Sequence, residues 1–446
     1  MSRTDPDGVE GGITLPWSRT NRPVPRRVVQ PLQAFLEQET SSAAMLIGAA
    51  VVALVWANSP WSASYGELWS TRLSIGLGSS SIDLDLRHWV NDGLMTLFFL
   101  VAGLEIKREL VTGELRRPRA RVLPVAAALG GMVVPALVYV AVVGVEGGGG
   151  WGMAMPTDIA LALGVLAIAG RRAPAGMKAF LLALAIVDDL GSIVVIAVIY
   201  SGRIEWLALG AALVVVVLIV ALRRIEVRAT TAYVVLGILL WVALQRSGAT
   251  PTLAGVALGL LMPAVAPNRP KAVSAEAHRI ADETTDDPEP PDTDAPQWLR
   301  LAWLSRESVS PLARAERLLH PWTSLAVLPL FALANAGVPL SPSRVAAAVS
   351  SRLALGIVLA RVLGKPVGIV AASAVAVRLG ARLPSAVGMR HVVAVGAAAG
   401  VPFAVSLFVA QLALPATLLD RATIGILGAA VIAGLAGGLL IRRETR

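Results

Sequence analysis

The sequence predicts an all-α polytopic membrane protein with about twelve transmembrane helices, and three observations support that class. Hydrophobic residues make up 55% of the 446 residues and charged residues only 15%, a balance too apolar for a soluble protein of this length. The mean hydropathy of the chain is +0.69. Apolar runs of about twenty residues, the length that crosses a hydrocarbon core of about 30 Å, recur along nearly the whole sequence.

Each expected span is a largely uncharged run bounded by charged or turn-forming residues. The first run is followed by Asn58-Ser59-Pro60 and not by a small-residue cleavage pattern, so we interpret it as a retained helix rather than a signal peptide. The expected spans cover residues 43–58, 88–106, 122–144, 151–170, 179–200, 205–222, 229–245, 250–265, 319–340, 353–377, 387–413 and 422–441.

Two segments depart from this pattern. Residues 71–86 alternate apolar and polar residues around a Gly-Ser turn, which predicts a small periplasmic β-hairpin. Its strand edges suit either pairing with a second subunit or exposure as a solvated loop. Residues 266–315 hold a run of acids among prolines and threonines, which predicts a disordered cytoplasmic loop. The expected organisation is a tail over 1–40, spans over 41–265, this acidic loop, spans over 316–441 and a tail over 442–446.

Loop charge predicts the orientation, because Lys and Arg gather in cytoplasmic loops. The net charge of +9 is spread over short basic clusters between spans, which indicates orientation rather than nucleic-acid binding. With an even number of spans, both termini are expected in the cytoplasm. The basic residues in alternate loops are Lys107, Arg108, Arg116, Arg117, Arg119, Arg121, Arg171, Arg172, Lys178, Arg223, Arg224, Arg228, Arg378 and Arg382.

Cysteine and histidine usage limits the chemistry. The chain has no cysteine and only four histidines, which lack the spacing of metal ligands. Disulfides, thiolate catalysis and cysteine-ligated metals are therefore excluded, and we expect no bound cofactor.

Three carboxylates are expected near the middle of the bilayer. Asp188 and Asp189 lie in an uncharged stretch between Lys178 and Arg203, about 15 Å from either end at a rise of 1.5 Å per residue. Asp158 lies near the middle of an earlier span. An acid at a helix centre costs roughly 2.5 to 3.5 kcal/mol of insertion free energy, so acids at this depth are candidates for a functional site.

Lys365 is expected at a similar depth on a later span, with Arg361 one helical turn before it. One reading of these charges is a structural salt bridge that only holds helices together. Three acids that share one base leave surplus negative charge, however, which protons or a bound cation must offset unless Arg361 also turns inward. Because neighbouring helical residues project about 100° apart, Asp188 and Asp189 are expected to face different partners.

Carboxylate oxygens suit a hard monovalent cation such as Na⁺ or Li⁺. Carboxylates that lie close together in a low dielectric titrate as a coupled group. A site that holds either protons or a metal ion, but not both, exchanges them by competition.

Two expected spans are interrupted. Met155-Pro156-Thr157-Asp158 places a proline and a cap-forming threonine beside a buried acid, which predicts an unwound segment followed by a second half-helix. Gly400-Val401-Pro402-Phe403 predicts a matching break. Paired interrupted spans indicate a binding site between inverted-topology repeats.

Several long motifs occur in one order along nearly the whole chain. They are Ala57-Asn58-Ser59-Pro60, Asn91-Asp92-Gly93-Leu94-Met95, Gly103-Leu104-Glu105-Ile106-Lys107-Arg108-Glu109-Leu110, Thr157-Asp158-Ile159-Ala160, Ala185-Ile186-Val187-Asp188-Asp189-Leu190-Gly191, His320-Pro321-Trp322, Phe331-Ala332-Leu333-Ala334-Asn335-Ala336-Gly337 and Gly364-Lys365-Pro366. In these motifs the sequence resembles the NhaA family of bacterial Na⁺/H⁺ antiporters.

The resemblance implies roles for the central charges. Asp188 and Asp189 would bind the ion and protons, with Asp189 as the direct ligand and Thr157 nearby. Asp158 and Lys365 would compensate the dipoles of two facing half-helices, with Asp188 as a partner of Lys365. Four further positions match residues implicated in pH activation, although a solvated charge network explains them equally well from sequence alone. These are Glu105, Arg108, Glu109 and Glu316.

On this resemblance we expect an electrogenic, pH-regulated antiporter in the bacterial plasma membrane. It would export cytoplasmic Na⁺ or Li⁺ in exchange for external protons, by alternating access at the buried Asp pair. Its expected partners are Na⁺, Li⁺, H⁺, membrane lipid and a second copy of the chain in a homodimer, without nucleic acid. No enzymatic activity is expected.

The sequence also departs from the family pattern. Thr250 stands in a segment where the family usually has a histidine linked to the pH response, which puts the pH profile in doubt. Pro156 and Pro402 stand where small residues are more common, and the acidic loop is longer than usual. An inactive homologue that has lost transport through these prolines is therefore one alternative. An intramembrane aspartyl protease is another, but its Tyr-Asp and Gly-x-Gly-Asp motifs do not occur in this sequence.

Overall fold

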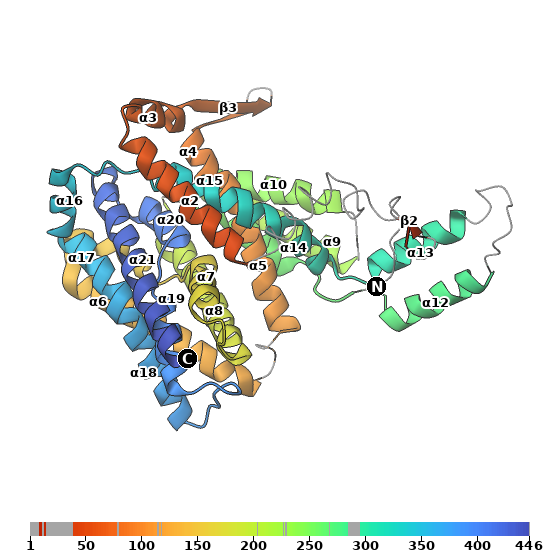
Figure 1. The fold of residues 1–446 in the computed structure, drawn as a ribbon. Helices are drawn as coiled ribbons and strands as arrows, with labels where there is room; N and C mark the ends of the chain where they lie inside the picture. Colours follow the sequence, from red (N-terminus) through yellow and green to blue (C-terminus); the bar gives the residue numbers. More distant parts are fainter. Residues whose placement is uncertain are drawn as a thin grey trace.

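The computed structural model describes residues 9–10, 13–14, 39–77, 80–113, 116, 118–202, 204–225, 227, 230–266, 268–283 and 295–445. Over these residues the chain forms a bundle of long helices (Figure 1). A β-hairpin lies at one end, and α12 (Pro270–Glu283) and α13 (Ala295–Glu307) project from one side. Most of the expected tail over 1–40 lies outside the described residues. The described part of this tail includes two short strands, β1 (Val9–Glu10) and β2 (Ile13–Thr14), which pair antiparallel.

The first part of the bundle follows the expected order of apolar segments. Its elements are α2 (Glu39–Ala57), α3 (Ser62–Ser70), β3 (Arg72–Leu77), β4 (Ser80–Asp85), α4 (Leu86–His88), α5 (Met95–Val111), α6 (Pro118–Val143), α7 (Ile159–Ala169), α8 (Ala175–Ile199), α9 (Trp206–Arg224), α10 (Thr230–Ser247) and α11 (Leu253–Leu261). A π-helical turn, Trp89–Leu94, joins α4 to α5, and a 3-10 helix, Val145–Ala154, precedes α7.

The second part begins after α13. Its elements are α14 (Pro311–Trp322), α15 (Leu328–Asn335), α16 (Pro342–Val349), α17 (Arg352–Leu359), α18 (Lys365–Arg378), α19 (Met389–Ala399), α20 (Ala404–Ala413) and α21 (Ala416–Glu444). π-helical turns, Thr323–Val327 and Ala360–Gly364, join α14 to α15 and α17 to α18. The last helix continues past its expected end at residue 441, with Arg442 and Arg443 in its final turn, where positive charge is favourable.

Serine side chains fix the starts of three of these helices. Ser310, Ser341 and Ser351 each accept a hydrogen bond from the backbone N–H three residues further on. This N-cap bond satisfies a donor that the first helical turn leaves without a partner. In each case the sequence itself carries the start signal for α14, α16 or α17.

Among the described residues, seven helices are long and apolar enough to cross a bilayer, or up to nine if each of two sharply bent pairs forms one span. The bent pairs are Ser41–Ala57 with Ser62–Ser70, at 114°, and Met389–Ala399 with Ala404–Ala413, at 52°. Several expected spans are shorter than a bilayer requires, and α11 has only 9 residues. The count of about twelve spans and the inverted repeats therefore stay predictions.

Glycines bring the helices that carry the central charges into backbone contact. A Cβ added to Gly130 of α6 or to Gly368 of α18 would overlap the backbone oxygen of the other residue. Gly259 of α11 also lies close to α5, where an added Cβ would meet the carbonyl oxygen of Leu100 at 2.7 Å. Small residues at such crossings are typical of membrane helix pairs. The first contact fixes α18, which begins at Lys365, against α6.

The hairpin predicted over 71–86 is confirmed. Strands β3 and β4 pair antiparallel, with Arg72 opposite Asp85 and Leu77 opposite Ser80. The guanidinium of Arg72 lies 2.6 Å from the carboxylate of Asp83. Its periplasmic location stays a prediction.

The expectation of disorder over 266–315 is wrong for α12 and α13. Val273, Ala277 and Ile280 recur at helical spacing and turn away from solvent, and Ile280 is fully buried. Arg300 of α13 lies 3.6 Å from Glu276 of α12. The expectation was based on the composition of the whole segment, and it missed this periodicity because the acids concentrate between the two helices. That acidic stretch, 284–294, lies outside the described residues.

Candidate ion-binding site

Two interrupted helices meet in the centre of the bundle. The first consists of the 3-10 helix ending at Ala154, an extended stretch, and α7. The second consists of α19 and α20, which are separated by residues 400–403. The extended stretches touch, because the backbone N–H of Asp158 lies 3.4 Å from the carbonyl oxygen of Val401. Both breaks fall where Pro156 and Pro402 predict them.

Asp158 lies between the N-terminal ends of two half-helices. Its Oδ1 accepts a hydrogen bond from the backbone N–H of Leu161 at 3.0 Å, and its Oδ2 accepts one from Ala404 at 3.1 Å. These donors belong to the first turns of α7 and α20, which carry partial positive charge. One buried carboxylate therefore bridges the first turns of both half-helices, and its role in charge compensation stays a prediction.

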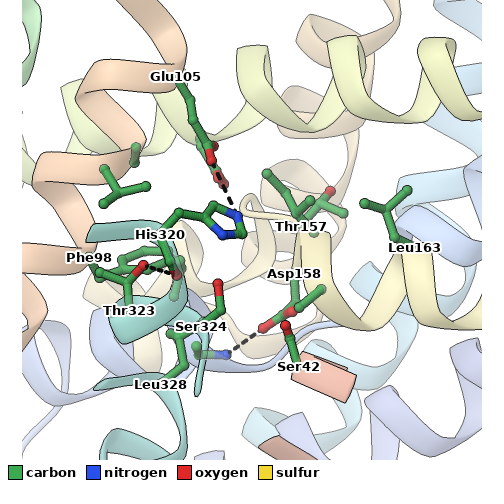
Figure 2. Close-up of a pocket in the computed structure, with 17 residues that line it drawn as sticks. Ser42, Phe98, Glu105, Thr157, Asp158, Leu163, His320, Thr323, Ser324 and Leu328 are labelled. Carbon is green, nitrogen blue, oxygen red and sulfur yellow. Dashed lines mark hydrogen bonds and ion pairs between the residues drawn. The ribbon is translucent and has the colours of Figure 1, made fainter. Parts of the chain in front are cut away.

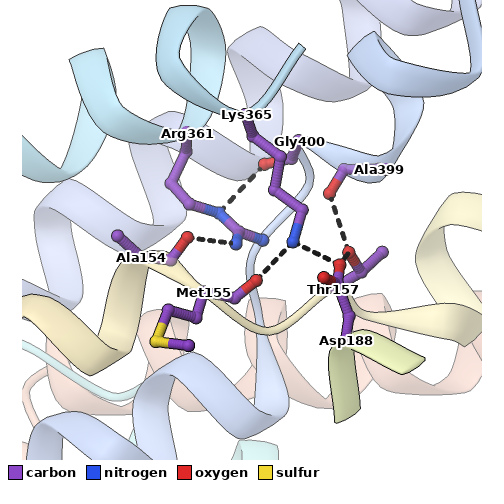
Figure 3. Close-up of polar contacts among 8 residues, drawn as sticks. All are labelled: Ala154, Met155, Thr157, Asp188, Arg361, Lys365, Ala399 and Gly400. Atoms are coloured by element: carbon purple, nitrogen blue, oxygen red, sulfur yellow. Dashed lines mark hydrogen bonds and ion pairs between the residues drawn. The ribbon is translucent and has the colours of Figure 1, made fainter. Parts of the chain in front are cut away.

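Among the described acids, Asp188 of α8 is the most enclosed, with a fully buried side chain. Its Oδ2 accepts from the ammonium of Lys365 at 2.5 Å and from the hydroxyl of Thr157 at 2.6 Å (Figure 3). Lys365 is fully buried as well, and it also donates to the carbonyl oxygen of Met155. The hydroxyl of Thr157 lies 3.2 Å from the carbonyl oxygen of Ala399. Asp188 is therefore tied to both interrupted helices.

Asp189 faces a different environment. It lines a cavity of about 130 Å³ together with Glu105, Thr157, Asp158 and His320. Figure 2 shows the labelled side chains of this cavity, which come from α2, α5, the first interrupted helix including α7, α14, the π-helical turn after α14, and α15. Oδ1 of Asp189 is buried and has no hydrogen-bond partner among the described residues. The two neighbouring acids thus face different surroundings, as their spacing on one helix predicts.

Arg361 also turns inward, and this changes the charge balance expected from the sequence. Its side chain is fully buried, and its nearest polar partners are backbone carbonyls of the interrupted helices (Figure 3). The centre of the bundle therefore holds three acids and two bases. The sequence predicted one base there, Lys365, and did not decide whether the side chain of Arg361 also turns inward. Helical periodicity places Arg361 one turn before Lys365, but it does not determine which face of the helix packs against the neighbouring helices. The sequence alone therefore does not show that Arg361 is buried.

Of the residues expected to act in pH activation, Glu105 lines the cavity, and the other three lie on the same helix, α5, or on α14. Arg108 forms an ion pair with Glu316, and Glu105 lies 4.0 Å from Nε2 of His320. Glu109 is on the same helix, with its carboxylate beside Gly113. In the sequence, His320 stands out only as part of the His320-Pro321-Trp322 motif. Its Pro-Trp context gave no signal that the ring would face an acid on another helix.

The described residues contain no group of three or more His, Asp or Glu side chains arranged to hold a metal ion. Asp188 and Asp189 alone therefore do not form a closed metal site. A cation at Asp189 would complete its coordination with hydroxyl or carbonyl oxygens and water, which are the ligands that hard cations prefer.

Long apolar helices with buried charges at the crossing of two interrupted helices define a multi-pass membrane protein of the ion-transporter class. The sequence profile of the Na⁺/H⁺ antiporter 1 family matches residues 33–441. The chain belongs to the NhaA family of Na⁺/H⁺ antiporters. This is a transporter family and not a family of catalytic enzymes.

Named relatives cover nearly the whole chain. Na(+)/H(+) antiporter NhaA 2 of Sorangium cellulosum is 43% identical over 446 residues, which cover 99% of this chain and 93% of the relative. Na(+)/H(+) antiporter NhaA of Cupriavidus necator is 43% identical, with 95% and 94% covered. Na(+)/H(+) antiporter NhaA 3 of Frankia alni is 40% identical, with 93% and 89% covered.

Proposed function

We propose that this protein exchanges Na⁺ or Li⁺ for protons at Asp188 and Asp189, exporting cytoplasmic sodium against external protons. The proposal rests on one observation. Asp189 lines the cavity with a buried carboxylate oxygen that has no hydrogen-bond partner among the described residues, while its neighbour Asp188 is paired with Lys365. A carboxylate at that depth requires a proton or a cation to offset its charge, which makes the two ions competitors.

The exchange proceeds in two halves. A cation that enters from the cytoplasm displaces the protons of the Asp pair and is held by Asp189, with the hydroxyl of Thr157 nearby. The two interrupted helices then rearrange, so that the site opens outward. External protons neutralise the carboxylates and release the cation, and the empty site returns with its protons.

Charge movement follows from the number of titrating groups. Two acids that bind protons in one half of the cycle face one monovalent cation in the other half. One net charge therefore crosses the membrane in each cycle, and the exchange is electrogenic.

Asp158 and Lys365 are proposed to compensate fixed charge rather than to carry the ion. The contacts of Asp158 with the starts of α7 and α20 support this role. Glu105, Arg108, Glu109 and Glu316 are proposed to set the pH range of activity from the mouth of the cavity, and the Arg108–Glu316 pair supports a shared electrostatic role.

The proposed setting is the bacterial plasma membrane, with both termini in the cytoplasm. The β3–β4 hairpin is proposed to lie outside the membrane and to contribute to a homodimer. Its exposed strand edges support that assignment.

Transport in reconstituted vesicles tests the proposal. Acid-loaded vesicles containing the protein should lose their pH gradient when Na⁺ or Li⁺ is added, as reported by a pH-sensitive dye. Asp189→Asn should abolish this response. Asp420→Asn is the matched control, because that acid pairs with Arg344 on an exposed surface.

Two results would contradict the assignment. A fully active Asp189→Asn variant would remove Asp189 from the mechanism. A folded wild-type protein without any Na⁺ or Li⁺ response across a pH series would instead indicate a homologue that no longer transports.

A further inference from the structure

Each interrupted helix leaves a carbonyl end inside the bundle. The 3-10 helix before the first break ends at Ala154, and α19 ends at Ala399 before the second break. The last carbonyls of a helix have no intrahelical donor, and the helix dipole places partial negative charge on them. Because these ends are buried, they need a donor from another element.

One side chain serves both ends. Nε of Arg361 donates to the carbonyl oxygen of Gly400 at 3.2 Å, and Nη1 donates to the carbonyl oxygen of Ala154 at 2.9 Å (Figure 3). A guanidinium presents its donors in a rigid planar fork, so it can bridge two acceptors that belong to different segments. The permanent charge of Arg361 therefore lies at the negative ends of both interrupted helices.

Asp158 mirrors this arrangement with the opposite charge. It accepts from the first turns of α7 and α20, which are the positive ends of the same two interrupted helices. Asp158 and Arg361, one anion and one cation, thus cap opposite ends at the point where the two interrupted helices cross. Each side chain bridges both of these helices.

Lys365 has a different set of partners. Its ammonium reaches one backbone carbonyl, that of Met155, and one carboxylate, that of Asp188. Since Arg361 occupies the carbonyl oxygens of Ala154 and Gly400, Lys365 is not needed at those ends. It can leave Asp188 and keep a hydrogen bond to Met155, without exposing a helix end.

We propose that Arg361 is a positioning residue for ion exchange. It is the fixed cation that holds the carbonyl ends of both interrupted helices, and it thereby frees Lys365 to release and recapture Asp188 as the site changes occupancy. The assignment rests on the proposed antiport function and adds a second base with a separate task.

Unfolding measurements test the structural half of this proposal. Arg361→Gln should lower the melting temperature of the purified protein by about 5 °C or more, because it leaves two buried carbonyls without donors. Lys365→Gln should lower it less, since Asp188 can take up a proton when its partner is removed. Arg378→Gln, on the exposed end of the same helix, is the control and should melt like the wild type. A lower melting temperature for Lys365→Gln than for Arg361→Gln would overturn the assignment.

The pH profile of exchange in vesicles tests the functional half. Loss of a permanent positive charge from the site should move the profile of Arg361→Gln by about half a pH unit or more toward alkaline values. Arg361→Lys should restore the profile at least in part, because it restores the charge without the bridging fork. A lower rate with an unchanged profile would mean that Arg361 only supports the fold, and would overturn the positioning role.

Two further outcomes are also decisive. If Arg361→Gln does not accumulate in the membrane while Lys365→Gln does, the expected order of stability is confirmed. Transport is then measured with Arg361→Lys in place of Arg361→Gln. A pH profile like that of the wild type supports the role of the charge, and an alkaline shift as large as that expected of Arg361→Gln contradicts it. If the wild-type protein does not respond to Na⁺, the proposed antiport fails, while the melting order still decides whether Arg361 or Lys365 holds the helix ends.

Discussion

Asp188 and Asp189 are adjacent in the chain, but only Asp188 is held by a base. Lys365 lies 2.5 Å from Oδ2 of Asp188, whereas Asp189 lines the cavity. Oδ1 of each acid is buried without a hydrogen-bond partner among the described residues. One acid of the pair is therefore held by a buried base, and its neighbour lies at the cavity.

Substitution of these acids should give opposite effects. Asp188→Asn leaves the buried charge of Lys365 without its counter-charge, which should destabilise the fold by about 3 kcal/mol. Asp189→Asn removes an unpaired acid and should leave stability equal to or above that of the wild type, with transport lost. Thermal unfolding of both purified variants checks this. A lower melting temperature for Asp189→Asn than for Asp188→Asn would show that the tasks are assigned the wrong way round.

Thr157 should affect affinity more than stability. Its hydroxyl donates to the carboxylate of Asp188 at 2.6 Å, and a hydrogen bond to a charged group contributes about 1.5 to 3 kcal/mol. Thr157→Val should therefore weaken the apparent Na⁺ affinity by about tenfold, as measured from the Na⁺ dependence of proton movement. Thr157→Ser keeps the hydroxyl and is the control. Equal affinities for the Val and Ser variants would exclude a role for the hydroxyl.

The contact between α6 and α18 depends on glycine. Gly368→Ala places a methyl group against the backbone oxygen of Gly130 and should destabilise the protein by more than about 2 kcal/mol. Gly428 lies inside α21 with no atom within 4 Å of an added Cβ, so Gly428→Ala should be neutral or stabilise by up to about 1 kcal/mol. Comparison of the two melting temperatures provides the measurement. If the two substitutions have equal effects, close packing of α6 on α18 is not what holds α18 in place.

The Arg108–Glu316 pair should set the pH of activation through its charge. Glu316→Gln removes negative charge near the cavity and lowers the local proton concentration, so activation should move to lower pH by about half a unit. Arg108→Gln removes positive charge and should move activation to higher pH by a similar amount. The pH dependence of Na⁺-driven proton movement measures both shifts. Shifts in the same direction would mean that the pair acts through packing and not through charge.

Asp85 should contribute a pH-dependent increment of stability. Burial favours its neutral form, but hydrogen bonds from the backbone and ring of His88 and the charges of His88 and Arg87 outweigh burial, so the pKa of Asp85 lies below its ordinary value. A carboxylate whose pKa is lower in the folded than in the unfolded state stabilises the fold at any pH above its unfolded-state pKa. This stabilisation is lost as the pH falls through its folded-state pKa.

Asp85→Asn tests this increment, because asparagine still caps α4 but carries no charge. The variant should melt below the wild type at neutral pH, and the difference should shrink as the pH falls below about 4 and vanish below the folded-state pKa of Asp85. Unfolding temperatures across a pH series provide the measurement. A difference that persists unchanged in acid would assign the effect to the lost hydrogen-bond geometry.

Local patterns predicted much of the site. The depth of Asp158, Asp188 and Asp189 follows from counting residues along apolar runs, and the helix breaks follow from Pro156 and Pro402. The β-hairpin follows from alternation over 71–86. The prediction failed for α12 and α13, because the average composition of a long segment conceals two short amphipathic helices beside an acidic stretch.

The sequence by itself determined the class of protein, the hairpin, the breaks and the burial of Asp158, Asp188 and Asp189, since hydropathy and backbone preferences act over a few residues. Only the tertiary structure decided that Asp188, and not Asp189, pairs with Lys365, which lies 177 positions further along the chain. It also decided that Arg361 turns inward to bridge Ala154 and Gly400. Such partners are selected by how helices rotate and cross, and that depends on close contacts, such as Gly130 against Gly368, between segments that the linear pattern does not connect.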